Sequence, residues 1–370
     1  MIINKIELKN YRLHKETKIN FSKHLNYIIG GNGQGKTSLI ESIYYLCTSK
    51  NLTQSKDLEV VSFNESYFNV VGNFSDLVNN SVRIFFNKYE NKKSVFVDEK
   101  NIGRASNLIG NFPVVTLIPT NHLIIKGAPN DRRKYFDSVI SQASNTYLKI
   151  LLDYNRTLKQ RYSLLNQIRE SKSKKLIDEL NVWTESLVNQ GSEIIEHRIK
   201  FLKIFEDYLK NAYKKIMDVV EIPSIEYSFL NNSKESNIKK TFIEELKKYE
   251  NLEIVRGNNL VGPHKDEFIF KLNKNELKKY GSQGQHKTFL IALRFGEFFY
   301  LKSIIGKTPI FLMDDIFGEL DAFRANKISE YLKEVGQAFI TLTDLSNFGY
   351  LSKSDEDLIL NIKNGQVSNA

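Results

Sequence analysis

Residues 30–37 read GGNGQGKT, and the interpretation of the rest of the chain depends on this stretch. It matches the pattern G-x-x-x-x-G-K-[ST] of a phosphate-binding loop. The residues before it, 25–29, are typical of a short buried strand, and apolar residues recur at helical spacing after Ser38. A strand, a glycine-rich loop and a helix N-terminus together predict a cradle for phosphate groups, because loop amides and the helix dipole both favour negative charge.

Each residue type in the loop has an expected role toward a nucleotide. Lys36 is expected to reach the β- and γ-phosphates, and Thr37 to offer its hydroxyl to Mg²⁺. A glycine turn followed by a chance Lys-Thr pair is the alternative, but it does not explain the strand and helix on either side. The expected cofactor-binding residues of the loop are Gly30, Gly31, Asn32, Gly33, Gln34, Gly35, Lys36, Thr37 and Ser38.

Two carboxylates follow an apolar run at 310–313, far along the chain from the loop. Asp314 is expected at the end of this strand, where it would complete the Mg²⁺ site that Thr37 begins. Asp315 is then a candidate to orient or deprotonate an attacking water. An acidic pair after a strand is by itself often a plain turn, and it is the pairing with the loop that favours a metal and catalytic role.

A second candidate anion site is the turn Gly281-Ser282-Gln283-Gly284-Gln285, which immediately precedes a predicted helix. Ser282 is also a plain helix cap in the alternative interpretation. Two such sites, far apart in sequence, suggest one nucleotide held between two chains, with the loop of one copy facing the turn of the other. Residues 319–321, Glu-Leu-Asp, either start a helix or form a loop across that interface.

Bulk properties limit the classes of protein that fit. The chain has 370 residues, 41% of them hydrophobic and only six of them proline, which is typical of a globular protein of two domains. The N-terminus alternates apolar and polar residues like an edge strand and has no signal-peptide pattern. The single cysteine, Cys47, rules out an internal disulfide and is expected in the core. We therefore expect a cytoplasmic protein, and its net charge of +10 suits a polyanionic partner.

The hydrophobic period changes along the chain and predicts three segments. Residues 1–130 contain short apolar runs that predict an antiparallel sheet beside the nucleotide-binding strand. Residues 131–250 have helical spacing with a polar break at 169–175, which predicts a helical hairpin or arm. Residues 251–370 return to a mixed pattern of helices and strands. Strands are expected at 67–74, 82–86, 94–97, 114–118, 268–272, 309–313 and 337–343.

The order of the motifs resembles the ABC-type ATPases of the SMC group, and more closely the RecF family of bacterial recombination-repair proteins. The resemblance covers nearly the whole chain. It implies an α/β fold, namely a P-loop ABC-type ATPase head with a mixed sheet and flanking helices. In this fold, residues 1–130 and 251–370 would be the two halves of the head, and residues 131–250 would be an inserted helical arm. Three further motifs favour the RecF family within this wider group. They are residues 126–129 with Arg132, Arg133 and Asp137, residues 160–162 with 164–165, and residues 261–266, Val-Gly-Pro-His-Lys-Asp.

The resemblance also implies function. It implies ATP and Mg²⁺ as cofactors, a homodimer that ATP closes on DNA, a weak DNA-dependent ATPase, and action with RecR and RecO to load RecA. The DNA would be double-stranded or a junction of single and double strands, and no membrane partner is implied. Arg12 matches a family position near the nucleotide, although a solvated charge beside a strand explains it equally well.

Two other functions use the same motifs. A transporter's nucleotide-binding subunit predicts a glutamine after the first sheet and a histidine near 344, yet Thr120-Asn121-His122 and Thr343-Asp344 occupy those places. An OLD-type nuclease predicts an additional acidic metal-binding domain. The residues that take the place of that glutamine (the Q-loop) and of the histidine that senses the γ-phosphate stay unassigned. Lys265, His286 and Lys287 also differ from the residues that are usual in the family.

The contacts to DNA are expected to be with its backbone. The lysines at 172, 174 and 175, at the predicted tip of the arm, either touch phosphates or form a solvated turn. No stretch of the sequence alternates aromatic and basic residues in a way that suggests base reading. We therefore expect low sequence preference and a steep dependence on salt.

Overall fold

The computed structural model describes residues 1–53, 55–171, 173–217, 221–230, 237–343 and 354–369. The chain divides into two compact units, of which the first holds residues 1–121, 211–220 and 288–370 and the second holds 122–210 and 221–287. Residues 251–287 lie in the second unit because a strand within them pairs with a strand near residue 225. The division into three functional segments stays a prediction.

The central sheet of the first unit carries the nucleotide-binding loop. Its order is β15-β14-β3-β13-β12-β8, and all neighbours are parallel except β14 and β15. Every residue of β3, β8, β12 and β13 is buried, as expected for parallel strands covered on both faces. The strands predicted around 25–29, 114–118, 309–313 and 337–343 are confirmed. The bounds are β3 Leu25–Ile29, β8 Val114–Leu117, β12 Ile310–Met313, β13 Ala338–Leu342, β14 Leu358–Lys363 and β15 Gln366–Asn369.

An antiparallel sheet forms the other layer of this unit, in the order β2-β1-β4-β5-β6-β7. Its strands are β1 Ile2–Tyr11, β2 His14–Asn20, β4 Tyr67–Ser75, β5 Asn79–Asn87, β6 Lys92–Val97 and β7 Lys100–Asn101. The prediction that the N-terminus is an edge strand is wrong, because β1 pairs with both β2 and β4. Its alternating pattern arises from one face packing on the core while the other faces outward, which a central strand of a half-covered sheet also shows.

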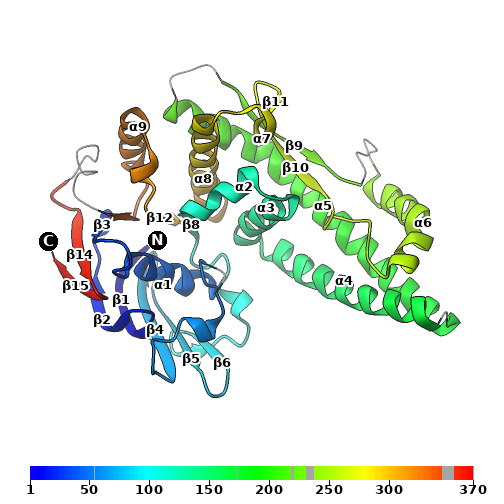
Figure 1. Cartoon of the computed structure of the whole chain (residues 1–370), viewed down its shortest axis with the longest axis horizontal. Helices are drawn as coiled ribbons and strands as arrows, with labels where there is room; N and C mark the ends of the chain where they lie inside the picture. The colour runs from blue at the N-terminus through cyan, green and yellow to red at the C-terminus, as the bar shows by residue number, and fades with distance from the viewer. Residues whose placement is uncertain (54, 172, 218–220, 231–236, 344–353, 370) are drawn as a thin grey trace. The chain divides into compact units, whose positions relative to one another are not determined.

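Helix α1 (Lys36–Thr48) packs between the two sheets of the first unit (Figure 1). Its apolar residues form one core with residues of both sheets, including Leu8 and Val70 from one sheet and Ile28 and Leu312 from the other. Cys47 is buried in this core, as predicted. Helix α8 (Gln283–Ile305) belongs to this unit from Thr288 onward. The unit also contains α9 (Ala322–Leu332) and the short helices η1 (Asp57–Glu59), η2 (Ala105–Leu108), η3 (Pro119–Asn121) and η4 (Phe317–Glu319).

The second unit is mainly helical. Helices α4 (Asn145–Ser171) and α5 (Lys174–Ile216) form the predicted hairpin, with Leu164, Leu165 and Ile168 packed against Leu180 near the break. Helix α6 (Ile238–Arg256) lies mostly within the segment predicted to be helical, but it was not predicted as a separate helix. Its ends carry local signals, because Asn237 caps its start and Gly257 ends it in a left-handed conformation. The other elements are α2 (His122–Lys126), α3 (Pro129–Ala143), β9 (Pro223–Ser228), β10 (Glu267–Leu272), β11 (Asn275–Glu276) and α7 (Leu277–Tyr280).

Candidate nucleotide-binding site

The glycines of the loop are required by its backbone. Gly33 and Gly35 have φ angles of 74° and 111°, in the region that favours glycine, and Gly35 is the residue that precedes α1. A Cβ on Gly30 would lie 2.4 Å from the carbonyl oxygen of Ile362 in β14. The loop therefore follows β3 and opens α1 as predicted, and at these positions no larger residue fits without strain.

Lys36 folds back over the loop. Its Nζ donates to the carbonyl oxygens of Gly30 at 2.5 Å and Gly31 at 3.0 Å. Burial lowers the pKa of this ammonium, while the nearby charges of Asp315 and Asp314 act in the opposite direction. The ammonium is therefore held above the loop, where it can exchange carbonyl oxygens for phosphate oxygens.

Thr37 and Asp314 meet beside the loop. The Thr37 hydroxyl donates to the carboxylate of Asp314, with its oxygen 2.9 Å from Oδ2. The Thr341 hydroxyl donates to Oδ1 of the same carboxylate at 2.7 Å. Burial raises the pKa of Asp314, which means that its lone negative charge is unfavourable in this place. A cation bound beside the carboxylate would compensate that charge. A hydroxyl and a carboxylate are hard oxygen donors, and this pair fits Mg²⁺.

Asp315 follows in a strained backbone conformation. Its φ is 48°, which is uncommon for a residue other than glycine, and its N–H donates to the hydroxyl of Thr341 at 2.8 Å. Such strain is often found where a side chain must be aimed into a site. Thr341 thus contacts both acids of the pair and fixes their relation to β13.

The loop and the acids border one hollow of about 300 Å³. Leu13 and Pro119 complete its wall beside the loop residues and the acidic pair. The residues that line it are Leu13, Asn32, Gly33, Gln34, Gly35, Lys36, Thr37, Ser38, Pro119, Asp314 and Asp315. The structure therefore brings together most of the residues predicted in the first unit, around a space suited to a phosphate chain.

A turn near the C-terminus buttresses the loop, and sequence reasoning missed it. The N–H of Gly365 donates to the Gln34 carbonyl at 2.9 Å, and the N–H of Asn364 donates to Gln34 Oε1 at 2.7 Å. The Asn-Gly pair at 364–365 between β14 and β15 is a strong hairpin signal and could have revealed the turn. The Gln34 side chain is therefore engaged within the protein.

His14 supports the loop from below. It is fully buried, with Nε2 3.1 Å from the carbonyl oxygen of Gly35 and Nδ1 3.1 Å from the hydroxyl of Thr17. Burial lowers the pKa of His14. In its neutral form Nε2–H donates to Gly35 and Nδ1 accepts from Thr17. Nothing in the sequence around His14 pointed to this contact, because the two residues are 21 positions apart and lie on different elements.

Arg12 lies outside the residues described as lining the hollow. Its Nε is 2.9 Å from Oε2 of Glu41, a buried residue of α1, and its other nitrogens contact Thr53, Ser55 and the Glu59 carbonyl. The guanidinium is thus engaged in an ion pair that joins the turn after β1 to α1. A contact between Arg12 and nucleotide stays a prediction.

The turn at 281–285 lies in the second unit and forms a reciprocal cap on α8. Gln285 N donates to Ser282 Oγ at 3.2 Å, and Ser282 N donates to Gln285 Oε1 at 2.8 Å. Ser282 and Gln283 are exposed, while Gln285 Nε2 donates to Glu221 at 2.7 Å. The helix cap that was the alternative interpretation of Ser282 is therefore present. A role of Ser282, Gln283, Gly284 and Gln285 in binding nucleotide stays a prediction.

Other predicted features have local roles or lie outside the description. Asp321 caps α9, accepting from the N–H of Arg324 at 2.9 Å. Asn121 accepts from the N–H of Ile118 at 3.1 Å, which shapes the η3 turn beside the hollow. The side chain of Glu319, and the residues Lys172 and Asp344, lie outside the described part of the chain.

Two of the remaining motifs, at Asp137 and at 261–266, meet at buried Arg198 in the second unit. Its guanidinium contacts Asp137 at 2.8 Å and Asp266 at 3.3 Å, and it donates to the Pro263 carbonyl at 2.8 Å. Burial raises the pKa of Asp266 to about 6, and burial lowers the pKa of His264 to about 3. Arg161 is likewise buried, with Glu253 at 2.9 Å and Asn259. These motifs hold the helices to β9 and β10.

The described residues contain no membrane-spanning helix and no ready-made cluster of metal ligands. Among them, none of the helices is long and apolar enough to cross a membrane. Within the same described ranges, no three side chains of His, Cys, Asp or Glu are grouped so as to hold a metal ion by themselves.

This chain is similar to known proteins in both sequence and fold. Residues 2–354 match the family model of the RecF/RecN/SMC N terminal domain. DNA replication and repair protein RecF of Chlorobium phaeobacteroides is 35% identical over 367 residues, which cover 97% of this chain and 100% of that protein. The RecF of Salinibacter ruber is 34% identical over 351 residues, or 93% of this chain and 85% of that protein.

A solved structure agrees with these relatives. The recombination mediator protein RecF-ATPrS in the RecFOR pathway has a TM-score of 0.89 and 31% identity, over 100% of this chain and 98% of that one. The expected fold, a mixed α/β ATPase head with a helical insertion, is therefore confirmed. On sequence, motif order and fold together, this chain belongs to the RecF family of DNA replication and repair proteins.

Proposed function

We propose that the chain is an ATP-dependent DNA-binding protein of recombinational repair and replication-gap processing. Two copies would close head to head, each offering its loop at 30–38 to one nucleotide and its turn at 282–285 to the other. The observation that carries the proposal is the pairing of Thr37 with Asp314 beside the loop, because it supplies both protein ligands that a nucleotide-bound Mg²⁺ needs.

The residues of the hollow have distinct roles in this proposal. Lys36 moves its ammonium from the Gly30 and Gly31 carbonyls onto the β- and γ-phosphates. Thr37 and Asp314 would hold Mg²⁺, which neutralises charge on the β- and γ-oxygens when bound. Asp315 orients the attacking water and takes its proton, and its backbone is fixed for this by the bond to Thr341.

The proposed partners follow from the family and from charge. The similar structure RecF-ATPrS is described as a recombination mediator in the RecFOR pathway, and we extend that role to this chain. Its partners would be double-stranded DNA and single/double-strand junctions, a second copy of itself, and RecR and RecO, with RecA loaded on gaps in the cytoplasm. A net charge of +10 is consistent with DNA as a partner. Hydrolysis would be slow and would time the release from DNA.

One experiment tests the core of this proposal. Binding of a labelled duplex is measured with ATP, with ADP and for Lys36→Ala with ATP, and the mass of the wild-type protein is measured in solution in parallel. We expect tight binding and a dimer only for wild type with ATP. Equal DNA affinity in all three samples, or a monomer at saturating ATP with duplex present, would overturn it.

A further inference from the structure

The outward face of the antiparallel sheet gathers aromatic and basic side chains that are dispersed in the sequence. Register places Lys9, Asn69, Phe85 and Ser94 in one row across four strands. The next row holds Glu7, Val71, Arg83 and Phe96. These residues lie on the face opposite to the one that packs against α1.

The rings and cations on this face contact each other. The Arg83 guanidinium lies 5.9 Å from the ring centre of Phe85 and 5.6 Å from that of Phe96. Its Nε donates to Asn69 Oδ1 at 2.8 Å, which restrains the guanidinium near both rings. The rings of Tyr67 and Phe85 are 5.6 Å apart, and Lys9 Nζ is 5.8 Å from the Tyr67 ring centre. Arg83 and Lys9 are exposed, and the three rings are half-buried.

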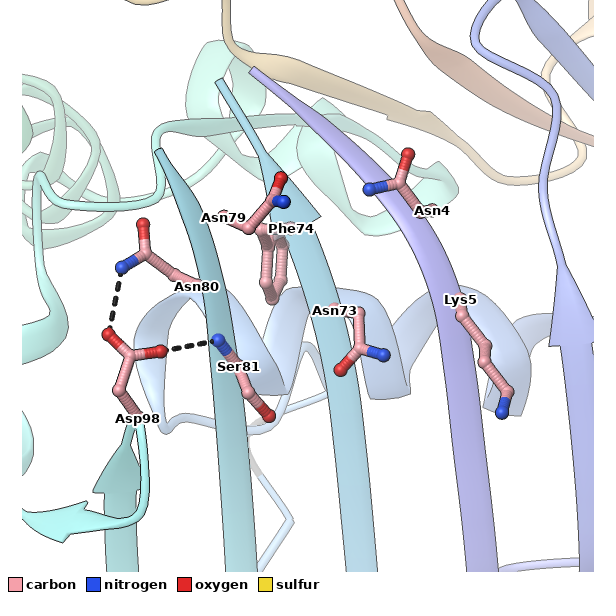
Figure 2. A pocket seen from close by; sticks show the side chains of 8 residues that line it. All are labelled: Asn4, Lys5, Asn73, Phe74, Asn79, Asn80, Ser81 and Asp98. Carbon is pink, nitrogen blue, oxygen red and sulfur yellow. Dashed lines mark hydrogen bonds between the residues drawn. The ribbon is translucent and has the colours of Figure 1, made fainter. Parts of the chain in front are cut away.

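A polar hollow of about 420 Å³ adjoins this cluster on the same sheet (Figure 2). Lys5, Asn73 and Ser81 form the row next to Arg83, and Asn4 and Asn79 lie at the strand ends beside it. The amides of Asn73 and Asn79 make no hydrogen bond to another residue in the described ranges. Asp98, at the rim, is engaged by Asn80 and the N–H of Ser81. The hollow thus offers unused donors and acceptors beside the aromatic rings.

The charge of this face favours a polyanion. Its basic residues are Lys5, Lys9, Lys18, Arg83 and Lys92, against the acidic residues Glu7, Glu16 and Asp98. Glu7 is paired with Lys5 at 2.7 Å and lies 3.7 Å from Lys18, so part of this charge is already neutralised. The remaining cations surround the rings, as on surfaces that bind unpaired nucleotides.

We infer that this face, defined by Lys9, Tyr67, Arg83, Phe85 and Phe96, binds single-stranded DNA by stacking its bases. A duplex hides its bases in its own stack, so the open sides of these half-buried rings can stack only on unpaired bases. The lysines would contact phosphates, and the amides would contact base edges. The inference rests on the proposed function for its choice of DNA. It gives the proposed junction preference a physical origin, since one face would bind the unpaired strand beside a gap.

The test uses the full chain without nucleotide. Affinity for a labelled 20-nucleotide oligo(dT) is measured by anisotropy for wild type, Arg83→Ala, Phe85→Ala and Arg83→Lys. We expect each alanine variant to lose about tenfold in affinity and Arg83→Lys to lose less, because the lysine keeps the charge but not the planar stack. Tyr89→Ala, which removes an exposed ring outside these rows, is the matched control and should bind like wild type.

A crosslinking experiment on the wild-type protein tests the same surface without relying on the folding of variants. An oligonucleotide carrying 5-iodouracil is irradiated with wild-type protein, and the crosslinked peptide is expected to contain Tyr67, Phe85 or Phe96. No binding of oligo(dT), unchanged affinity in both alanine variants, an equal loss of oligo(dT) and duplex binding, or crosslinks confined to other peptides would each overturn the inference. Duplex binding that ignores ATP would instead remove the proposed function and leave this result untouched.

Discussion

Thr37 and Asp314 are 277 positions apart in the sequence, and the threonine hydroxyl donates a hydrogen bond of 2.9 Å to the aspartate carboxylate. The contact joins the start of α1 to the end of β12, so the loop and the acidic strand are held in register before any nucleotide arrives. Thr341 fixes the other carboxylate oxygen from β13. Three elements thus set the position of one pair of oxygens, and this rigidity is what a metal site requires.

Asp314→Asn should therefore weaken the affinity for ATP only when Mg²⁺ is present. The amide replaces a charged oxygen ligand, and we expect a loss on the order of 10- to 100-fold in the dissociation constant for MgATP. Equilibrium binding of a fluorescent ATP analogue, with Mg²⁺ and with EDTA, measures it. In EDTA the variant and wild type should bind alike. A loss of the same size in EDTA would show that Asp314 acts on the fold and not through the metal.

Asp315→Asn should separate binding from turnover. The side chain keeps its size and loses its basicity, so ATP binding should persist while phosphate release falls by roughly 100-fold or more. The mass of the protein with ATP is then expected to stay that of a dimer for longer than in wild type. Unchanged phosphate release would remove Asp315 from the proposed water-orienting role.

Gly365→Ala should disturb the nucleotide loop from the other end of the chain. Gly365 has a φ of 75°, and a Cβ there would lie 2.2 Å from the carbonyl oxygen of Leu13, beside the bond from Gly365 to Gln34. Gly103→Ala is a matched control, because its φ is 69° and nothing lies within 4 Å of an added Cβ.

Both variants carry the backbone strain of about 1 kcal/mol, but only Gly365→Ala adds the clash. We expect Gly103→Ala to lower the free energy of unfolding slightly and to leave the ATP dissociation constant unchanged. Gly365→Ala should weaken ATP binding as well. Equal ATP affinity in the two variants would show that the turn at 364–365 does not position the loop.

The parts of the site that the sequence could predict are those with local patterns. The loop at 30–37, the strand before it and the acids after β12 can each be predicted from about ten consecutive residues. The other predicted strands and the helical hairpin also follow from such short stretches. The supports of the site are not local. Gln34 contacts Asn364 because β14 pairs with β3, and Arg83 lies over Phe96 because β5 pairs with β6. His14 contacts Gly35 although His14 belongs to the antiparallel sheet and Gly35 to the loop that follows β3 of the other sheet. Sequence spacing alone carries no signal for such contacts.

Arg12→Ala should lower stability, because it leaves Glu41 as a buried carboxylate without its cation. Glu41 is 2% exposed, and in the variant it would keep, among the contacts of the described residues, only the hydrogen bonds from Thr53. Removal of one partner of a buried pair typically costs about 3–5 kcal/mol, and since Arg12 is partly exposed we expect the lower end. Urea unfolding measures the loss.

The double variant Arg12→Met with Glu41→Gln distinguishes the two roles weighed for Arg12. It removes both charges and should recover most of the stability. If Arg12 also contacts nucleotide, the double variant will still bind ATP more weakly than wild type. An ATP affinity equal to that of wild type would assign Arg12 to the fold alone.

His264 should make the protein less stable in mild acid. Its folded pKa of about 3 lies below its ordinary value of 6.5, since the ring is buried and accepts from the Tyr154 hydroxyl at 2.7 Å. The unfolded chain therefore binds the extra proton between pH 6.5 and 3, and stability falls through this window by up to about 1.4 kcal/mol per pH unit. Asp266, with a folded pKa raised to about 6, acts in the opposite direction, because the fold binds its proton more tightly.

The contribution of His264 is isolated by comparison with His264→Asn, whose amide oxygen can still accept from Tyr154 but does not titrate. Urea unfolding of both proteins at pH 7.5 and 5.5 is the measurement. Wild type should lose more stability than the variant between these two values, by about 1 kcal/mol. Because Asp266 titrates in both proteins, its effect cancels in the difference. Parallel losses would mean that His264 is not the buried neutral ring described, and that the acid sensitivity of the second unit lies elsewhere.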